Sequence, residues 1–555
     1  MPRRGALGSP PVLAPRLPEY DVAEWERRPF PERLRMVCQA WAEQGYGTPP
    51  VVYVAYLAKI GLYVAGWAAF VASTPGVDGG IGSWWASDVA FQKAILWTIL
   101  FEALGLGCGS GPLTGRYFPP MGGVLYFLRP GTTKLPLVPG LPVLGRRTRS
   151  WVDVVLNVAL YGLLLRGLLA PEIGAAQVVP VVVVLVLVGL ADKTAFLATR
   201  PDHYLIVLIA FAFTDWLPAT KLIWVAIWWW AATSKLNRHF PSVVAVMVSN
   251  SPTIRWRAFK RAMYRRFPDD LRPSRLAAAM AHGGTVIEYL FPLGLLLGRG
   301  GTLTFVALAV MVAFHLFITS SIPMGVPIEW NVMMVYGGFV LFGVNAPVRA
   351  WEVSSPPLVA FLVLFLLVVP VVGNLWPRYV SFLMSMRYYA GNWAYSVWLF
   401  RRGTSAKLDE GLVKTSPGLR VQLGRMYDEV TTTGLLSKVM AFRAMHLHGR
   451  ALQVLVPRAV EDIDDYEWLD GELVAGMVVG WNFGEGHLHD ERLLAAVQSQ
   501  CGFAPGELRC IFVESQPMGR GTMHWRIWDA AEGRLAEGRI SVRELVDLQP
   551  WPEGS

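Results

Sequence analysis

The sequence predicts an all-α polytopic membrane bundle of about ten transmembrane helices, followed by a small α/β soluble domain at the C-terminus. Three observations support this fold class. Of the 555 residues, 53% are hydrophobic and only 16% are charged, whereas a soluble protein of this size needs more charge to cover its surface. Nearly all long apolar runs precede Arg378. The remainder of the chain has the mixed composition of a soluble domain.

The apolar runs supply the elements of the bundle in order. A hydrocarbon core about 30 Å thick needs about 20 apolar residues per helix, and several runs are shorter than that. We predict spans at Val51 to Ala72, Val89 to Gly107, Val152 to Ala170, Val178 to Ala191, Tyr204 to Trp216, Leu222 to Thr233, Thr285 to Leu297, Thr302 to Ser320, Trp330 to Phe342 and Pro357 to Leu375. The chain then divides into an N-terminal segment (1–50), a transmembrane domain (51–377) and a C-terminal domain (378–555).

The basic residues between the spans predict the orientation. A net charge of +9 could indicate a nucleic-acid partner, but the charges lie in loops between apolar runs, as membrane topology requires. With the N-terminus inside, the outer side holds few cations, namely Lys93, Arg166, Lys221, Arg299 and Arg349. The inner loops are far more basic, above all the segment Arg255 to Arg275. We therefore expect a plasma-membrane protein with both termini in the cytoplasm and no nucleic-acid partner.

The C-terminal third has soluble-type patterns. Arg378 to Arg402 is aromatic and basic, which predicts an interfacial helix or a docking segment. Strand-like runs follow at Val474 to Trp481, Leu508 to Glu514 and Met523 to Trp528, and a helical run lies at Asp490 to Gln500. These runs predict the small α/β domain.

Two His-x-His pairs occur in this domain, His446 with His448 and His487 with His489. Alternate residues of a strand share a face, so each pair could bind a metal; the alternative is that they are ordinary polar loop residues. The four cysteines show no C-x-x-C spacing, and no third ligand has a characteristic position. We predict no metal site.

Ionisable residues inside apolar spans cost several kcal/mol unless they are paired or hydrated, so each is a functional candidate. The set comprises Lys59, Glu102, Asp153, Asp215, Lys235, Glu288, His315 and Glu329. The stretch from Pro201 to Asn331 is the densest. Its motifs are Asp202-His203-Tyr204-Leu205, a Trp228-Trp229-Trp230 run ending in Lys235-Leu236-Asn237, His282-Gly283-Gly284 with Glu288 beyond it, and Phe314-His315.

In this order and at this spacing, the motifs resemble the horizontally transferred transmembrane domain family, which includes the vitamin K-dependent γ-carboxylases. The resembling core covers about residues 201–345. The acidic residue that follows the Lys-Leu pair in the carboxylases is Asn237 here. The whole chain also resembles a bacterial family of multi-pass membrane proteins without an assigned function.

The carboxylase resemblance implies roles for five residues. Lys235 matches the base that acts on a reduced quinone, and His203 matches a proton-transfer histidine; His315, His282 and Glu288 complete the candidate catalytic set. A poorly solvated site favours the neutral, basic form of a lysine. The alternatives are an interfacial lysine at Lys235, packed histidines at His203 and His315, and a helix-start role for His282.

The resemblance also implies a cofactor, because the tryptophan run Trp228 to Trp230 could hold the flat ring of a reduced quinone. Three functions remain open. The first is a membrane enzyme acting on a quinol or another lipophilic small molecule. The second is a transporter or flippase for a lipid-linked substrate, with Glu102, Asp215 and Glu288 along its path. The third is a membrane scaffold with a cytoplasmic interaction domain. The enzyme hypothesis predicts that Lys235, His203 and His315 converge on one apolar cavity.

Overall fold

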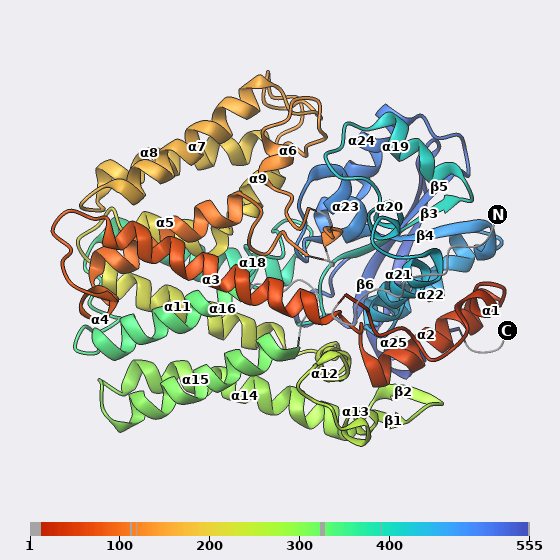
Figure 1. Cartoon of the computed structure of the whole chain (residues 1–555), viewed down its shortest axis with the longest axis horizontal. Helices are drawn as coiled ribbons and strands as arrows, with labels where there is room; N and C mark the ends of the chain where they lie inside the picture. Colours follow the sequence, from red (N-terminus) through yellow and green to blue (C-terminus); the bar gives the residue numbers. More distant parts are fainter. Residues whose placement is uncertain (1–12, 112–113, 118, 322–327, 389, 553–555) are drawn as a thin grey trace, which may run out of the picture.

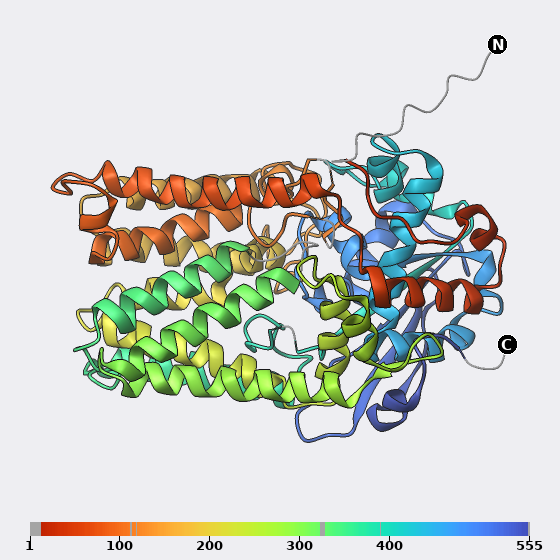
Figure 2. The same cartoon turned by 60° about the horizontal axis from the view of Figure 1, so that its bottom comes forward.

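The computed structural model describes residues 13–111, 114–117, 119–321, 328–388 and 390–552. The long helices form a bundle, and a β-sheet with its own helices packs against one end of it (Figure 1). The helices of the N-terminal segment lie at this same end (Figure 2). The first twelve residues of the predicted N-terminal segment lie outside the described residues.

The bundle follows the apolar runs of the sequence. Its helices are α3 (Pro50–Ala72), α5 (Asp88–Ala103), α7 (Trp151–Leu169), α8 (Ala175–Ala191), α10 (Ile206–Ala210), α11 (Trp216–Ser234), α14 (Arg275–Leu297), α15 (Thr302–Ser321), α16 (Ile328–Gly338), α17 (Pro356–Val363) and α18 (Val369–Leu375). Short connecting helices are α4 (Ile81–Trp84), α6 (Val124–Phe127) and α9 (Lys193–Ala198). π-Helical turns lie at Pro201–Leu205, Phe339–Val344 and Leu364–Val368.

Within the described residues, five helices are long and apolar enough to cross a membrane: α3, α7, α14, α15 and the continuous helix Pro356–Leu375. The prediction of about ten spans is therefore not supported. Helix α5 has 16 residues, a rise of about 24 Å, and nearly all of its side chains are buried in protein. In place of the predicted span Tyr204 to Trp216, the chain forms α10, of five residues. These apolar runs are short because they pack inside the bundle.

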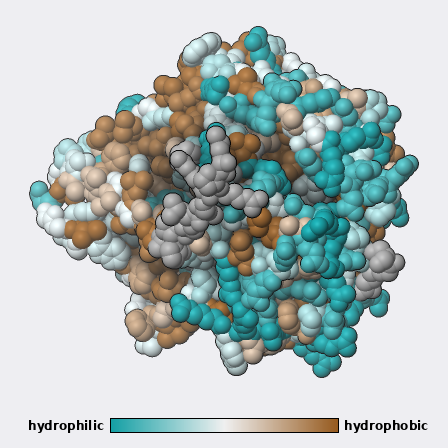
Figure 3. Space-filling view, turned by 45° about the vertical axis from the view of Figure 1, so that its right-hand side comes forward, coloured by the Kyte–Doolittle hydropathy of each residue, from teal (hydrophilic) through white to brown (hydrophobic). Residues whose placement is uncertain are grey.

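The spanning helices direct apolar side chains outward. Leu57, Phe305 and Leu316 are 68%, 73% and 65% exposed. Figure 3 shows hydrophobic surface on one side of the molecule and hydrophilic surface on the other. An exposed apolar surface on α-helices, whose backbone groups bond internally, is stable in lipid. The prediction of a helical membrane protein is confirmed.

The C-terminal part contains a five-stranded antiparallel sheet with the strand order β4-β3-β5-β6-β7. The strands are β3 (Tyr395–Arg401), β4 (Tyr466–Asp470), β5 (Leu508–Val513), β6 (Thr522–Asp529) and β7 (Gly533–Ser541). Its helices are α19 (Lys407–Gly411), α20 (Leu419–Gly424), α21 (Glu429–Ala444), α22 (Leu447–Ala459), α23 (Gly471–Val479), α24 (Glu491–Cys501) and α25 (Val542–Asp547). The predicted strands at Leu508 and Met523 are confirmed as β5 and β6, and the predicted helix at Asp490 as α24.

Two predictions for this region are wrong. Residues Val474 to Trp481 were expected to form a strand, but Gly471–Val479 is helix α23. The Asp470 carboxylate caps this helix by accepting hydrogen bonds from the backbone amides of Glu472 and Leu473. The spacing of apolar residues in the sequence gives no information about such a cap. The expected interfacial helix at Arg378 to Arg402 is also absent from the described residues, because the last part of this segment, Tyr395–Arg401, is strand β3, buried between β4 and β5.

The N-terminal helices share a core with distant parts of the chain. Helices α1 (Val22–Glu26) and α2 (Phe30–Gln44) pack on α21, and the ring of Trp41 lies 5.4 Å from that of Phe442. The Trp41 indole donates to the carbonyl of Val246, 3.2 Å away, in α12 (Phe240–Asn250). The basic segment that follows forms α13 (Arg257–Ala262) and the hairpin of β1 (Tyr264–Arg266) and β2 (Asp270–Pro273). Helices α1, α2 and α21 and this segment therefore form one unit at the sheet-bearing end of the bundle (Figure 1).

Arg443 gives a test of how this unit is held together. Its buried guanidinium lies 2.6 Å from Asp470 and 2.9 Å from Glu472. We expect Arg443→Met to leave two buried carboxylates uncompensated and to destabilise the fold by about 3–5 kcal/mol, visible as a lower melting temperature of the detergent-solubilised chain. Arg425→Gln is the control, because Arg425 is exposed. Equal melting of the two variants would contradict this account of the contact.

Candidate functional site

An apolar cavity of about 120 Å³ lies where α11 ends, between α11, α12, α14 and α15. Among its aliphatic and aromatic walls it has three ionisable residues from spanning or bundle helices, Lys235, Glu288 and His315. Each of the three is at least 94% buried. The cavity therefore brings together three of the five candidate catalytic residues, from sequence positions up to 80 residues apart.

Lys235 and Glu288 form a direct pair. The Lys235 Nζ lies 2.5 Å from a Glu288 carboxylate oxygen. The amine also lies 5.6 Å and 5.7 Å from the ring centroids of Phe240 and Phe314, which line the same cavity. A short amine–carboxylate contact in apolar surroundings can hold its proton on either partner. Lys235 is thus an interior residue with one acidic partner, not a lysine reaching toward solvent.

His315 has both ring nitrogens occupied. Trp228 Nε1 donates to its Nε2 at 3.2 Å, so the Nδ1 carries the proton and donates to Asn331 Oδ1 at 2.8 Å. This arrangement fixes the ring orientation and a neutral tautomer. A histidine held in this way positions its neighbours, and it offers no free nitrogen to a substrate.

His203 lies behind the cavity wall. Its Nε2 accepts from Trp330 Nε1 at 2.9 Å, its Nδ1 contacts Asp202, and the Tyr388 hydroxyl lies 3.3 Å from the Nδ1. Trp330 and Tyr388 both line the cavity, so His203 adjoins it through two side chains and does not enter it. Asp202 also pairs with Arg200 at 3.1 Å.

The sequence gives little indication that Tyr388 and Arg200 lie beside Asp202 and His203. Tyr388 comes from 185 residues further along the chain, and Arg200 stands outside the motif that singled out His203. The signal that was available for Arg200 is its position two residues before Asp202, at the start of an apolar helix.

The remaining candidates do not meet at the cavity. His282 is exposed and lines a separate, polar pocket. The tryptophan run points in three directions: Trp228 to His315, Trp229 to the carbonyl of Tyr289 and Trp230 to the carbonyl of Leu366. The three indoles therefore do not form a single wall for a flat ring.

One group among the described residues has the arrangement of a possible metal site. Ligand atoms of Glu102, Cys108 and Glu329 lie within 4.8 Å of one another, all buried. The Cys108 thiol lies 3.2 Å from Glu329 and 3.0 Å from Arg200, and the Cys108 amide donates to Glu102 at 2.8 Å. The Arg200 guanidinium already faces the Cys108 thiol, so hydrogen bonds account for much of the close approach of these side chains. Glu102 and Cys108 are six residues apart, but Glu329 comes 221 residues after Cys108, so sequence spacing did not indicate the group.

The two His-x-His pairs are buried. The rings of His446 and His448 stack 5.4 Å apart, and His489 Nδ1 lies 2.7 Å from the Ser396 hydroxyl. His487 lies between two carboxylates, 3.1 Å from Glu485 and 3.0 Å from Glu514. His446 and His448 lie at the start of α22, whereas His487 and His489 lie in the segment between α23 and α24, so the alternative of polar loop residues describes the second pair only.

The electrostatics of His487 follow from these contacts. Burial alone would lower its pKa, but the carboxylates of Glu514 and Glu485 raise the pKa of His487 to about 9. In turn, although burial acts the other way, His487 holds the pKa of Glu514 at about 2. A doubly paired imidazolium thus joins the loop after α23 to the end of β5.

The apolar bundle and the charged residues buried within it define an integral membrane protein with several spanning helices. The chain belongs to a family described as transmembrane proteins of unknown function (DUF3556), whose model matches residues 11–555. No curated protein and no solved structure matches the chain. The family establishes the membrane class and brings no activity with it.

The His487 contacts predict a specific dependence of stability on pH. Because the folded pKa of about 9 exceeds the ordinary 6.5, protonation of His487 stabilises the fold fully below pH 6.5, and this contribution is lost as the pH rises through 9. We expect His487→Gln to lower the melting temperature most below pH 6.5, by an amount equivalent to roughly 3 kcal/mol, and least above pH 9. His524→Gln, at a half-exposed histidine, should leave the profile unchanged. A deficit that is constant with pH would contradict the prediction.

Proposed function

We propose that this protein is a membrane-embedded enzyme that transfers protons to and from a lipophilic substrate at the Lys235–Glu288 pair. One observation carries the proposal: an amine and a carboxylate 2.5 Å apart face an otherwise apolar cavity. Burying such a pair destabilises a protein relative to an apolar pair of the same size. Buried ionisable pairs in a cavity are typical of acid–base sites.

The chemistry needs only these two groups and a weakly acidic substrate. When Glu288 holds the shared proton, Lys235 is a neutral amine and can accept a proton from a substrate hydroxyl. The products are a substrate oxyanion and a lysine ammonium, so the opposite charges form side by side in a site without bulk water. The His315 ring, fixed by Trp228 and Asn331, keeps the wall opposite the pair in place.

The cavity size limits the substrate. Its volume of about 120 Å³ is close to that of an apolar cavity of about 150 Å³ that binds benzene. A single aromatic ring fits, and a long chain would have to extend toward lipid. A reduced quinone has such a ring, two weakly acidic hydroxyls and an isoprenoid tail, and the carboxylase-like motifs of the sequence favour the same class.

A transporter path through the acidic residues has less support. Asp215 accepts the amides of Ser354 and Ser355, at 2.7 Å and 2.9 Å, in a loop at a helix end. Glu102 belongs to the Cys108 group, and Glu288 is paired with Lys235. These carboxylates have separate partners in separate places, which disfavours one continuous polar path.

The enzyme proposal is tested by Lys235→Met in membranes supplied with a reduced quinone. We expect turnover to fall at least 100-fold, the usual contribution of a general base. The charge-swapped variant Lys235→Glu with Glu288→Lys preserves an ion pair and separates the two roles: a structural pair would be rescued by the swap, and a catalytic base would not. Lys407→Met is the matched control, since Lys407 pairs with Glu507 on the soluble part.

A second measurement does not depend on the choice of quinone. A deletion strain complemented with Lys235→Met should accumulate the same lipophilic metabolite as the deletion itself, whereas complementation with Lys407→Met should remove it. If Lys235→Met restores the wild-type metabolite profile and turnover at normal expression, the proposal is wrong.

We also propose that the sheet-bearing end of the molecule and both termini lie in the cytoplasm, at the plasma membrane. The basic segment at α13, β1 and β2 lies at that end (Figure 1), and basic segments are retained inside. Arg266→Cys, at an exposed position, in a Cys501→Ser background should react with a membrane-impermeant maleimide only after the cells are opened. Labelling in intact cells would reverse the orientation.

A further inference from the structure

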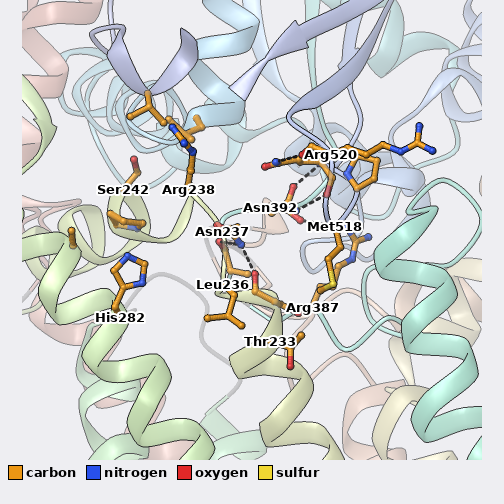
Figure 4. A pocket seen from close by; sticks show the side chains of 18 of the residues that line it. Thr233, Leu236, Asn237, Arg238, Ser242, His282, Arg387, Asn392, Met518 and Arg520 are labelled. Atoms are coloured by element: carbon orange, nitrogen blue, oxygen red, sulfur yellow. Dashed lines mark hydrogen bonds between the residues drawn. The ribbon is translucent and has the colours of Figure 1, made fainter. Parts of the chain in front are cut away.

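A second, larger pocket of about 640 Å³ lies at the junction of the bundle with the C-terminal part. It is bounded by the end of α11, by α12, by the first half of α14 and by the loop after β5 (Figure 4). Its volume lies within the range of about 300–1,000 Å³ typical of small-molecule sites. His282, which the sequence analysis included among the candidate catalytic residues, lies on the α14 wall of this pocket (Figure 4).

All the charged side chains in the described lining of this pocket are basic. Its described lining includes five arginines and no aspartate or glutamate; they are Arg238, Arg265, Arg387, Arg450 and Arg520. Carboxylates outside the lining act on two of these arginines, and each also has another partner. Asp270, which acts on Arg450, pairs with Arg272 at 2.5 Å. Glu514 and Glu485, which act on Arg387, pair with His487 at 3.0 Å and 3.1 Å. Clustered guanidinium groups without acidic partners repel one another, and an anion removes that repulsion.

Two of the five arginines are buried and lack partners for part of their guanidinium groups. Arg450 and Arg387 are 1% and 2% exposed. Arg450 uses its Nη1 on the carbonyl of Leu548 at 2.8 Å, while its Nε and Nη2, and the Nε of Arg387, have no partner among the described residues. Burial lowers the pKa of Arg450 to about 10. Buried donors of this kind are normally satisfied, so their geometry indicates a missing acceptor.

The pocket also lies at the boundary between lipid and water. Thr233 and Ser234, the last residues of α11, and Leu236 and Asn237 just beyond it border the pocket, and Leu236 is 63% exposed. Helix α14 continues from the pocket wall into a candidate membrane span. This is the depth at which lipid headgroups lie.

We propose that this arginine-lined pocket binds a phosphate-bearing group at the membrane surface. Several guanidinium groups around one space match the multiple oxygens of a phosphate better than a single carboxylate would. A lipid headgroup and a free phosphate compound present the same chemistry to the arginines. The site does not depend on the reaction at Lys235, because its ligands are different residues.

The experiment titrates two probes into the purified full chain in nonionic, phosphate-free detergent. The probes are short-chain phosphatidic acid and inorganic pyrophosphate. Their binding is measured by isothermal titration calorimetry. We expect both Arg238→Gln with Arg520→Gln and the single variant Arg387→Met to weaken binding at least tenfold. Arg425→Gln with Arg534→Gln removes the same charge from exposed positions outside the pocket and should leave the affinity unchanged.

The two probes distinguish the sources. Tighter binding of phosphatidic acid than of pyrophosphate assigns the site to a lipid headgroup, and equal or weaker binding assigns it to a free phosphate compound. The proposal is overturned if neither probe binds or if short-chain diacylglycerol, which has no phosphate, binds as tightly as phosphatidic acid. It is also overturned if the exposed pocket pair Arg238 and Arg520 can be replaced without loss of affinity in a chain that still melts like the wild type.

Discussion

Pairing of buried charge holds the end of the bundle that faces the sheet. Arg149, just before α7, lies 2.8 Å from Asp192 at the end of α8 and also donates to the carbonyl of Val479 in α23, so one side chain connects two bundle helices to the sheet-bearing part. Lys134 and Asp153 form a second buried pair beside it. Neither lipid nor bulk water can solvate these groups, so loss of one partner would leave the other as a buried, unpaired charge. These pairs therefore hold α7 and α8 against the sheet-bearing part in one arrangement.

Helix α11 connects the two pockets. Near its end, Ala231 and Lys235 line the apolar cavity, whereas Thr233, Ser234 and Leu236 line the arginine pocket. Successive residues of a helix point in different directions, so one turn of α11 borders the apolar cavity on one face and the arginine pocket on another. An amphiphilic molecule at the membrane surface would meet both environments within a short distance. This arrangement favours lipophilic ligands with a charged group over purely apolar or purely soluble ones.

The candidate site was partly predictable. Lys235, Glu288 and His315 were identified because an ionisable group in an apolar run needs an explanation, and the structure places all three at one cavity. Their pairing was not predictable, since Lys235 and Glu288 are 53 residues apart and hydropathy carries no information on which helices touch. The partners of His203 were missed for the same reason, because Tyr388 lies 185 residues further along the chain, after the last apolar helix of the bundle.

The sequence by itself determined the class of protein, since a chain with this much apolar surface and so little charge is stable only in lipid. It also determined the strands β5 and β6, whose alternation and turns are local. Tertiary structure decided which apolar runs face lipid and which are covered: α5 and α3 both follow predicted spans, yet α5 is buried and α3 is exposed. It also decided that Gly471–Val479 is a helix. Burial and partner choice depend on contacts between distant segments, and a linear pattern does not contain them.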